Sequence, residues 1–438
     1  MSLKAGSSAV CISPSSTQFL DGYPLVRRFS TGVDTDLYSS ALYVENGAQR
    51  WLAMSLDLLF LDKDSVQAIR AGIEAQTSLA AGSIMVAVTH THSAPVSRGP
   101  YPFYVNDPQR HPDSQYLEWV VEQAILSGVE AFNRAQAAEI GFALADSSAI
   151  GGNRRVAGGT ADPEVPVLAV READGQGLLA ILLVVSVHPT VLHEDSTLVS
   201  GDFPGHTRTA LQQDFGGIPI VYFTGAAGNQ SPRHFTRNNT VSEASRLGNL
   251  LADSVKAALQ EMVFEKSPRL GLEGIQVEEF LFNDFPEVEA AKQREERLRL
   301  RFESMREAGE DPRVIRTAET DWFGAIRMRL LAERKASGEL EATSRENCLP
   351  AEIQVLRVGA QLFVSWPGEV FVEFALALRE KRPDCRVITY ANGHTQGYLV
   401  TAEAVEEGGY EASAATFKSP ESAQALVSAT IELLNSLD

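Results

Sequence analysis

The fold is decided around the segment Ser83-Ile84-Met85-Val86-Ala87-Val88-Thr89-His90-Thr91-His92. Its apolar part is too short for a helix, so it predicts a buried strand over Ser83–Thr89. Helix-like stretches precede and follow this strand, at Asp62–Leu79 and Ser114–Asn133. Such an alternation of strands and helices is typical of α/β proteins. Two histidines stand where the strand ends.

The same alternation continues along the chain. Further strands are predicted at Leu42–Glu45, Trp51–Phe60, Glu139–Ala145, Val165–Arg171, Leu178–Val187, Ile218–Phe223, Ala351–Val358, Gln361–Trp366 and Arg386–Tyr390. Further helices are predicted at Ser242–Val263, Val370–Arg379 and Pro420–Leu437, and Asp62 is placed to cap the helix that it opens. The pattern predicts an α/β (α+β) fold, in which a mixed β-sheet core is flanked by helices in one layered domain over residues 1–438.

Residues 286–343 have a different composition, rich in Glu, Arg, Lys and Leu. They predict one or two exposed amphipathic helices, broken near Gly309-Glu310-Asp311-Pro312. We interpret this segment as a charged helical insertion that covers one edge of the core. Its charges are expected to form a solvated face.

Composition excludes several classes of protein. With 438 residues and 44% hydrophobic content, the chain can bury a large core, which excludes general disorder. The 57 acidic and 38 basic residues give a net charge of −19, so no nucleic-acid partner is expected. No run approaches the ~20 apolar residues of an integral membrane segment. The N-terminus lacks the apolar stretch of a secretory signal, so a cytoplasmic location is expected.

Three histidines follow predicted buried strands. His90 and His92 follow one strand, and His188 follows another. Ligands of open α/β sheets bind beyond the carboxyl ends of the strands. A His-x-His pair on an extended chain points both imidazoles to one side. His193 and His206 are expected in loops near the same place.

Two other strand ends carry glycine-rich sequence. Ile218–Phe223 leads into Thr224–Pro232, whose small residues let the backbone approach a ligand closely. This loop lacks the Lys-Ser/Thr ending of a phosphate loop, and the chain has no Gly-x-Ser-x-Gly elbow of a serine hydrolase. Gln361–Trp366 leads into Pro367-Gly368-Glu369, which is expected to place Glu369 in the first turn of the next helix.

His90, His188 and Glu369 form a candidate metal site. Two imidazoles and one carboxylate suit Zn²⁺ with one open position, as in catalytic sites where the metal lowers the pKa of water to roughly 7. The alternative for each residue is a structural role. A histidine is often simply hydrogen-bonded in a core, and a carboxylate is favoured at a helix N-terminus.

Several short segments occur in an informative order. They are Leu37-Tyr38-Ser39-Ser40-Ala41-Leu42, His90-Thr91-His92-Ser93-Ala94-Pro95, Asn153-Arg154, Val187-His188-Pro189-Thr190, Gly228-Asn229-Gln230-Ser231-Pro232, Pro367-Gly368-Glu369, Gly397-Tyr398-Leu399-Val400-Thr401 and Gly409-Tyr410-Glu411. This order resembles that of the neutral, non-lysosomal ceramidase family. Because the segments extend from Leu37 to Tyr410, the resemblance covers most of the chain.

The resemblance implies a mixed α/β catalytic domain with a single bound zinc. The metal ligands would be His90, His188, Glu369 and Tyr398, and His92 would transfer protons or support the ligands. The remaining site residues would contact the substrate or the developing oxyanion, and they are Arg154, Ser231, Tyr410 and, for the substrate, Asn229. The implied function is a hydrolase of sphingolipid metabolism that cleaves the N-acyl amide bond of ceramide, or of a ceramide-like lipid or small molecule, by metal-activated water.

The sequence departs from the family at a few places. Asn229 stands where the family has Asp, and His394 lies where the family has an aromatic residue. We expect a catalytic domain without the immunoglobulin-like C-terminal domain of longer members. A smaller or more polar N-acyl substrate is therefore also considered. Two alternatives stay open, a zinc hydrolase that cleaves an ester or peptide bond of a small polar substrate, and a non-catalytic binding protein.

Overall fold

The computed structural model describes residues 2–23, 26–47, 49–98, 111–175, 177–413 and 415–437. Its largest sheet contains, in spatial order, β11 (Ile220–Thr224), β9 (Leu178–Val185), β8 (Glu164–Glu172), β6 (Gln136–Asp146), β1 (Lys4–Cys11), β3 (Tyr38–Asn46), β4 (Gln49–Leu56) and β5 (Ile84–Val88), with β13 (Phe264–Glu265) paired to β6. Strands β9 and β11 pair in parallel, as do β4 and β5, whereas the pairs between them are antiparallel. The predicted mixed sheet is confirmed.

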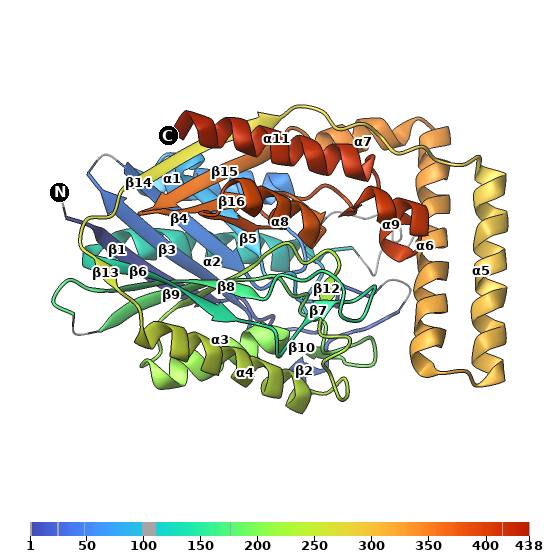
Figure 1. Ribbon diagram of the computed structural model, residues 1–438, viewed down its shortest axis with the longest axis horizontal. Coiled ribbons are helices and arrows are strands. Elements are labelled where there is room, and N and C mark those ends of the chain that lie inside the picture. Colours follow the sequence, from blue (N-terminus) through green and yellow to red (C-terminus); the bar gives the residue numbers. More distant parts are fainter. Residues whose placement is uncertain are drawn as a thin grey trace.

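A second, smaller sheet lies against the first one (Figure 1). Its strands are β14 (Leu270–Val277), β15 (Ala351–Val358), β16 (Gln361–Ser365) and β18 (Cys385–Ile388). Apolar side chains from both sheets meet in one core, among them Trp51 and Val221 from the first sheet and Leu356 and Phe363 from the second. Burial of this shared apolar surface holds the sheets face to face.

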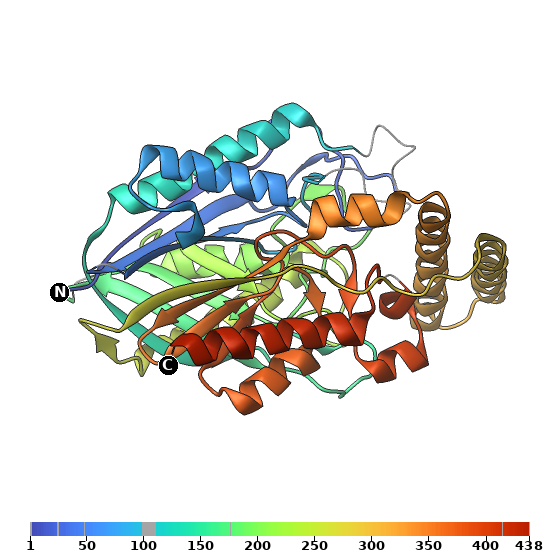
Figure 2. The same ribbon diagram turned by 90° about the horizontal axis from the view of Figure 1, so that it is seen from above.

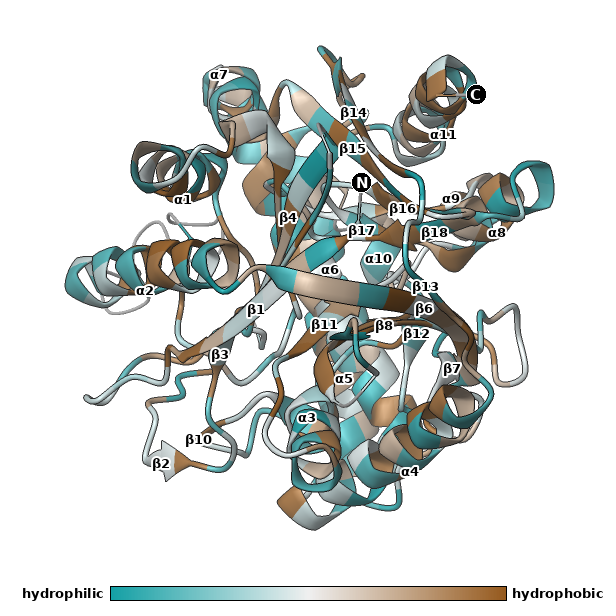
Figure 3. Ribbon diagram, turned by 90° about the vertical axis from the view of Figure 1, so that its left-hand side faces the viewer, coloured by the Kyte–Doolittle hydropathy of each residue, from teal (hydrophilic) through white to brown (hydrophobic). Residues whose placement is uncertain are grey.

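Helices cover the two outer faces, which makes four layers (Figures 2 and 3). Along the first sheet lie α1 (Lys63–Gln76), α2 (Ser114–Asn133), α3 (Asp202–Asp214) and α4 (Val241–Gln260), and along the second lie α8 (Val372–Lys381) and α11 (Ser419–Leu437). Alternation along β3 explains the arrangement. Tyr43 joins the core under the helices, while its neighbours Leu42 and Val44 join the core between the sheets.

Short elements at the strand ends build the loops of one end of the molecule. They are β2 (Gly32–Val33), β7 (Gly152–Asn153), β10 (Leu198–Val199), β12 (Gln230–Ser231), β17 (Glu369–Val370), β19 (Tyr398–Leu399), α9 (Ala402–Glu407) and α10 (Tyr410–Ser413), whereas η1 (Ala81–Ser83) directly precedes β5 at the opposite end of that strand. Strand β12 pairs with β7, and β17 pairs with β19, so loops from distant parts of the sequence are joined by backbone hydrogen bonds.

Three of the longer elements in the described ranges were not expected from the sequence, and neither were the short ones at the strand ends. Strand β1 is rich in small residues, and β14 is interrupted by glycines and half exposed, so neither shows clear alternation. Helix α3 begins Asp202-Phe203-Pro204-Gly205, a sequence that is more typical of a turn. His206 therefore lies on a helix and not in a loop, which corrects the expectation.

The charged segment forms α5 (Val288–Ala308) and α6 (Pro312–Ala336), followed by α7 (Glu339–Cys348). Helix α5 ends at Gly309, whose φ of 65° suits a residue without a Cβ, and the Asp311 side chain caps α6 by accepting from the Arg313 N–H. The two helices stand at the end of the molecule opposite both termini (Figure 1). Helix α6 is buried along one side, including Phe323 and Gly324, so its charges do not simply form a solvated face.

Cys11, Cys348 and Cys385 are all free, and the last two are buried. None of the helices in the described ranges combines the length and the apolarity that crossing a bilayer would demand.

Candidate metal centre

Strand ends bring the predicted histidines together. His90 and His92 follow β5, and the His90 N–H donates to the carbonyl oxygen of Leu58 over 2.9 Å. His188 follows β9, and its N–H donates to the carbonyl oxygen of Gln230 over 3.1 Å. The three imidazoles offer ring nitrogens that all lie within 4.8 Å of one another.

Glu369 reaches the same place from the second sheet. Its Oε2 lies 3.5 Å from His90 Nε2 and 3.4 Å from His188 Nε2. The sequence placed Glu369 in the first turn of a helix, and this is corrected. Glu369 belongs to β17, where it pairs with Tyr398, and α8 starts only at Val372. The strand pairing fixes the Glu369 backbone in an extended conformation.

The ring orientation of His90 and His188 turns their Nε2 atoms toward the carboxylate. The Nδ1 of His90 lies 2.8 Å from the carbonyl oxygen of Leu59, and the Nδ1 of His188 lies 2.5 Å from that of Ala227. A carbonyl can only accept, so each Nδ1 carries a proton, and Nε2 is the nitrogen that faces the carboxylate. Backbone partners of this kind commonly orient metal-binding histidines.

A cation fits this arrangement. Within the described part of the chain, His188 Nε2 and Glu369 Oε2 are buried and have no hydrogen-bond partner. Buried polar atoms without partners are costly, and a divalent ion between them would satisfy both. Imidazole nitrogens and a carboxylate oxygen, each about 2 Å from the ion, are a donor set that Zn²⁺ accepts.

Burial tunes the ionisation of these groups. It lowers the pKa of His188 to about 4, so this imidazole is neutral at pH 7 and able to bind a cation. Burial alone would raise the pKa of the Glu369 carboxyl, but the imidazoles of His90 and His188 keep it well below its ordinary value. The centre therefore presents a negative carboxylate beside the neutral His188 imidazole.

His92 differs from the other two histidines. Its Nε2 lies 3.4 Å from His90 Nε2, but its Nδ1 is buried and has no partner among the described residues. The ring packs edge-on against Tyr23, with centroids 5.3 Å apart, and directly on Gly22. Burial, followed by the charge of His90, lowers the pKa of His92 well below its ordinary value. His92 thus belongs to the same histidine cluster, but no backbone carbonyl orients its ring.

Tyr398, Tyr410 and Arg154 adjoin the centre. The rings of Tyr398 and Tyr410 meet edge to face with centroids 5.8 Å apart, and the Arg154 guanidinium lies 5.4 Å from the Tyr398 ring centroid. Arg154 donates from Nε to Glu411 over 3.0 Å and from Nη2 to the carbonyl oxygen of Gly228 over 2.8 Å. Burial raises the pKa of Tyr398 well above its ordinary value, so ionisation of this phenol requires a nearby cation.

Ser231 and Asn229 lie in the loop that supports His188. Ser231 follows Gln230 in β12, and its Oγ accepts from the Arg233 N–H over 3.2 Å. Both ends of the Asn229 amide are already used, because Oδ1 accepts from the Val372 N–H over 3.0 Å and Nδ2 donates to Glu373 over 2.8 Å. In this structure Asn229 braces the start of α8.

Two aromatic residues at the centre were missed by the sequence analysis. The Tyr390 ring stacks on the His90 imidazole, with centroids 3.9 Å apart and planes 13° apart, and Phe60 meets the same imidazole edge-on at 4.8 Å. His90 and Tyr390 have φ values of 63° and 54°, which are uncommon for residues with a side chain. The sequence does not predict positive φ values at these two positions, because neither residue is a glycine.

Helix α6 also contributes to the surroundings of the centre. Arg327 donates from Nη2 to the carbonyl oxygen of Gln396 over 2.8 Å, and a Cβ on Gly324 would lie 3.3 Å from the Cα of Tyr410. At its other end, Arg316 pairs with Glu194 at 2.8 Å. The predicted insertion is thus fixed to loops that lead to the site.

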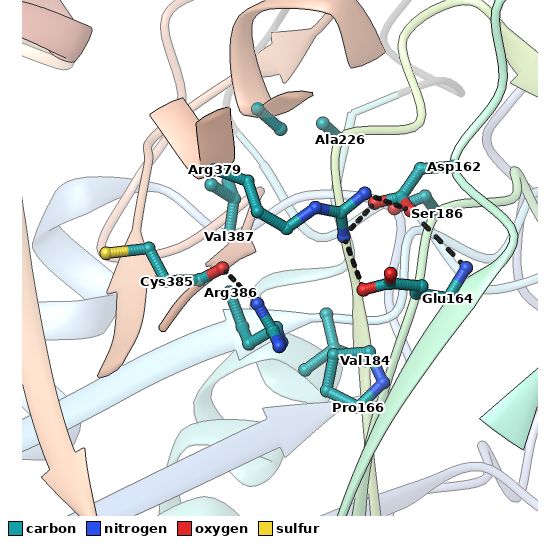
Figure 4. Close-up of a pocket in the computed structure, with 11 residues that line it drawn as sticks. Asp162, Glu164, Pro166, Val184, Ser186, Ala226, Arg379, Cys385, Arg386 and Val387 are labelled. Carbon is teal, nitrogen blue, oxygen red and sulfur yellow. Dashed lines mark hydrogen bonds and ion pairs between the residues drawn. The ribbon is translucent and has the colours of Figure 1, made fainter. Parts of the chain in front are cut away.

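A small pocket lies apart from the histidines (Figure 4). Arg379 crosses it and pairs with Asp162 at 2.7 Å and with Glu164 at 3.0 Å. Ser186 and Ala226, from the strand ends that precede His188 and its supporting loop, line the same pocket. None of the predicted site residues lines it.

Comparison with known proteins places the fold. The neutral ceramidase from Pseudomonas aeruginosa aligns with a TM-score of 0.75 and 17% identity, over 100% of this chain and 74% of that one. A ceramidase complexed with C2 aligns with a TM-score of 0.73 and 16% identity, over 100% of this chain and 75% of that one. A scan against protein-family models and a search of curated proteins find no match. The chain has the fold of a neutral ceramidase, as the resemblance implied.

Proposed function

We propose that this chain is a zinc-dependent amidohydrolase of the neutral ceramidase family, which cleaves the N-acyl amide bond of ceramide or of a ceramide-like compound. One observation carries the proposal. The Nε2 atoms of His90 and His188 converge on Oε2 of Glu369, at 3.5 and 3.4 Å, with each Nδ1 held by a backbone carbonyl. The fold and the order of the sequence segments support the same family.

In this proposal, His90, His188 and Glu369 hold the zinc, and Tyr398 lies beside Glu369 as the fourth ligand. A bound Zn²⁺ supplies Lewis acidity for a carbonyl and lowers the pKa of water to about 7. Both imidazoles are already oriented for metal binding. Burial also keeps His188 neutral, which is required because a protonated ring cannot bind a cation.

Amide hydrolysis also requires a proton for the departing amine. His92 is the nearest further imidazole, it is neutral, and its Nδ1 has no partner among the described residues. We assign proton transfer to His92. Arg154 and Tyr410 lie on the Tyr398 side of the centre, where a donor aimed at the developing oxyanion is worth about 3 kcal/mol.

The direct test is a substrate panel on the purified chain supplied with zinc. The panel contains short-chain ceramide, an N-acyl amino acid, the matched ester and a peptide. We expect hydrolysis of N-acyl amides, lost with a chelator and restored by zinc. Preference for the ester or the peptide would favour the alternative hydrolase, and a zinc-loaded chain that cleaves none of them would contradict the proposal.

A further inference from the structure

Tyr390 carries a buried hydroxyl without a partner at the centre. The residue lies just beyond β18 and is 2% exposed, and its hydroxyl has no hydrogen-bond partner within the described ranges. A tyrosine that is buried usually satisfies its hydroxyl. His188 Nε2 and Glu369 Oε2 also lack partners, and the Tyr390 ring contacts the histidines of the same centre, so a ligand bound there could pair with the hydroxyl as well.

The backbone fixes Tyr390 to the strand that bears His90. The Val88 N–H donates to the Tyr390 carbonyl oxygen over 3.3 Å, and the Asn392 N–H donates to that of Val86 over 2.7 Å. The side chain then stacks on the His90 imidazole at 3.9 Å. Tyr390 has a φ of 54°, which is uncommon for a residue with a side chain, so these contacts hold it against a conformational cost.

The surroundings of the hydroxyl belong to the reaction site. The charged groups that act on it are Glu369 and Arg154, and burial raises its pKa well above the ordinary value. A tyrosine hydroxyl carries a proton that it can donate in a hydrogen bond. The Tyr390 ring also lies near His188, with centroids 6.3 Å apart.

We propose that Tyr390 is a further catalytic residue, whose hydroxyl donates a hydrogen bond to the carbonyl oxygen of the scissile amide while its ring holds the His90 imidazole in place. This inference rests on the proposed function. In this inference Tyr390 both contacts the substrate and supports His90, a candidate metal ligand.

The experiment compares Tyr390→Phe with Tyr222→Phe. Tyr222 is a matched control, because it is 1% exposed and its hydroxyl also lacks a partner among the described residues, yet it packs on Phe203 under α3. For each variant we measure the bound zinc per chain, the kcat and KM on an N-acyl amide, and the Kd of acetohydroxamate. The carbonyl of acetohydroxamate imitates that of the substrate.

We expect Tyr390→Phe to keep its zinc, since the stacked ring remains. Its kcat should fall roughly 100-fold, as on loss of an oxyanion donor, and it should bind the hydroxamate about tenfold more weakly. Tyr222→Phe should behave as wild type. The inference is overturned if the two variants are indistinguishable, or if Tyr390→Phe loses its zinc. If wild type binds the hydroxamate but cleaves no amide, the proposed function fails, and the difference in Kd alone decides the role of Tyr390.

Discussion

The Nε2 atom of His188 lies 3.4 Å from Oε2 of Glu369, and both atoms are buried without a hydrogen-bond partner among the described residues. A buried carboxylate facing a lone pair is unfavourable unless a positive charge lies between them. Because the Nδ1 proton of His188 is committed to the Ala227 carbonyl, the ring cannot turn to relieve the contact. A cation between the two atoms would satisfy both of them.

His188→Ala should abolish zinc binding and activity together. Loss of a ligand should weaken zinc affinity by more than the roughly 10- to 100-fold known for residues that only orient ligands. Zinc titration with a competing chelator measures this change. The control is His206→Gln, on α3, where the imidazole pairs with Asp34 at 3.1 Å and lies outside the histidine cluster. Equal zinc affinity in the two variants would refute the assignment of His188.

His92→Ala should keep its zinc but lose about 100-fold or more in kcat, the usual contribution of a general acid or base. The reason is that the Nδ1 of His92 lacks the backbone carbonyl that orients the other two rings. Metal analysis and kinetics on the same preparation check this. A variant without zinc would make His92 a ligand, and a fully active variant would remove its assigned role.

Gly324→Leu should raise KM and lower the melting temperature. A Cβ at Gly324 already lies 3.0 Å from the Ser413 side chain and 3.3 Å from the Tyr410 Cα, so a larger side chain must push α6 away from α10. Overpacking of this kind costs about 1–3 kcal/mol. Ala336→Leu, at an exposed position of α6, is the control and should leave both quantities unchanged. If KM were also unchanged in Gly324→Leu, contact between α6 and the site would be irrelevant to the substrate.

Glu243→Gln should change how stability depends on pH. The hydrogen bonds from Arg246 lower the pKa of Glu243 to about 2, whereas an unfolded Glu has a pKa of about 4.3. The folded state thus binds fewer protons between these values, so this stabilisation is present above about pH 4.3 and is lost as the pH falls to 2. In urea unfolding, the difference in the free energy of unfolding between wild type and variant should disappear as the pH falls over that range. A difference in the free energy of unfolding that stays constant with pH would contradict the prediction. The control is Glu310→Gln, at an exposed position, which should unfold with the same free energy as wild type.

Local sequence patterns were sufficient to predict most of the secondary structure. The apolar strand that precedes His90 and the break at Gly309–Asp311 were both predicted, because strand alternation, glycine and capping residues act over a few neighbouring residues. Prediction was wrong for α3 and for the surroundings of Glu369. At the start of α3, proline and glycine are typical of a turn. At Glu369, pairing with Tyr398, 29 positions later, decides the backbone conformation.

The sequence by itself determined that His90, His92, His188 and Glu369 stand at element ends, where loops are free to carry chemistry. Only the tertiary structure decided which nitrogen of each ring faces the carboxylate, because that depends on the carbonyls of Leu59 and Ala227 in other loops. It also decided that Tyr390 stacks on His90. The physical reason is that hydrogen bonds and ring contacts are made across space, between residues whose separation along the chain leaves no periodic trace.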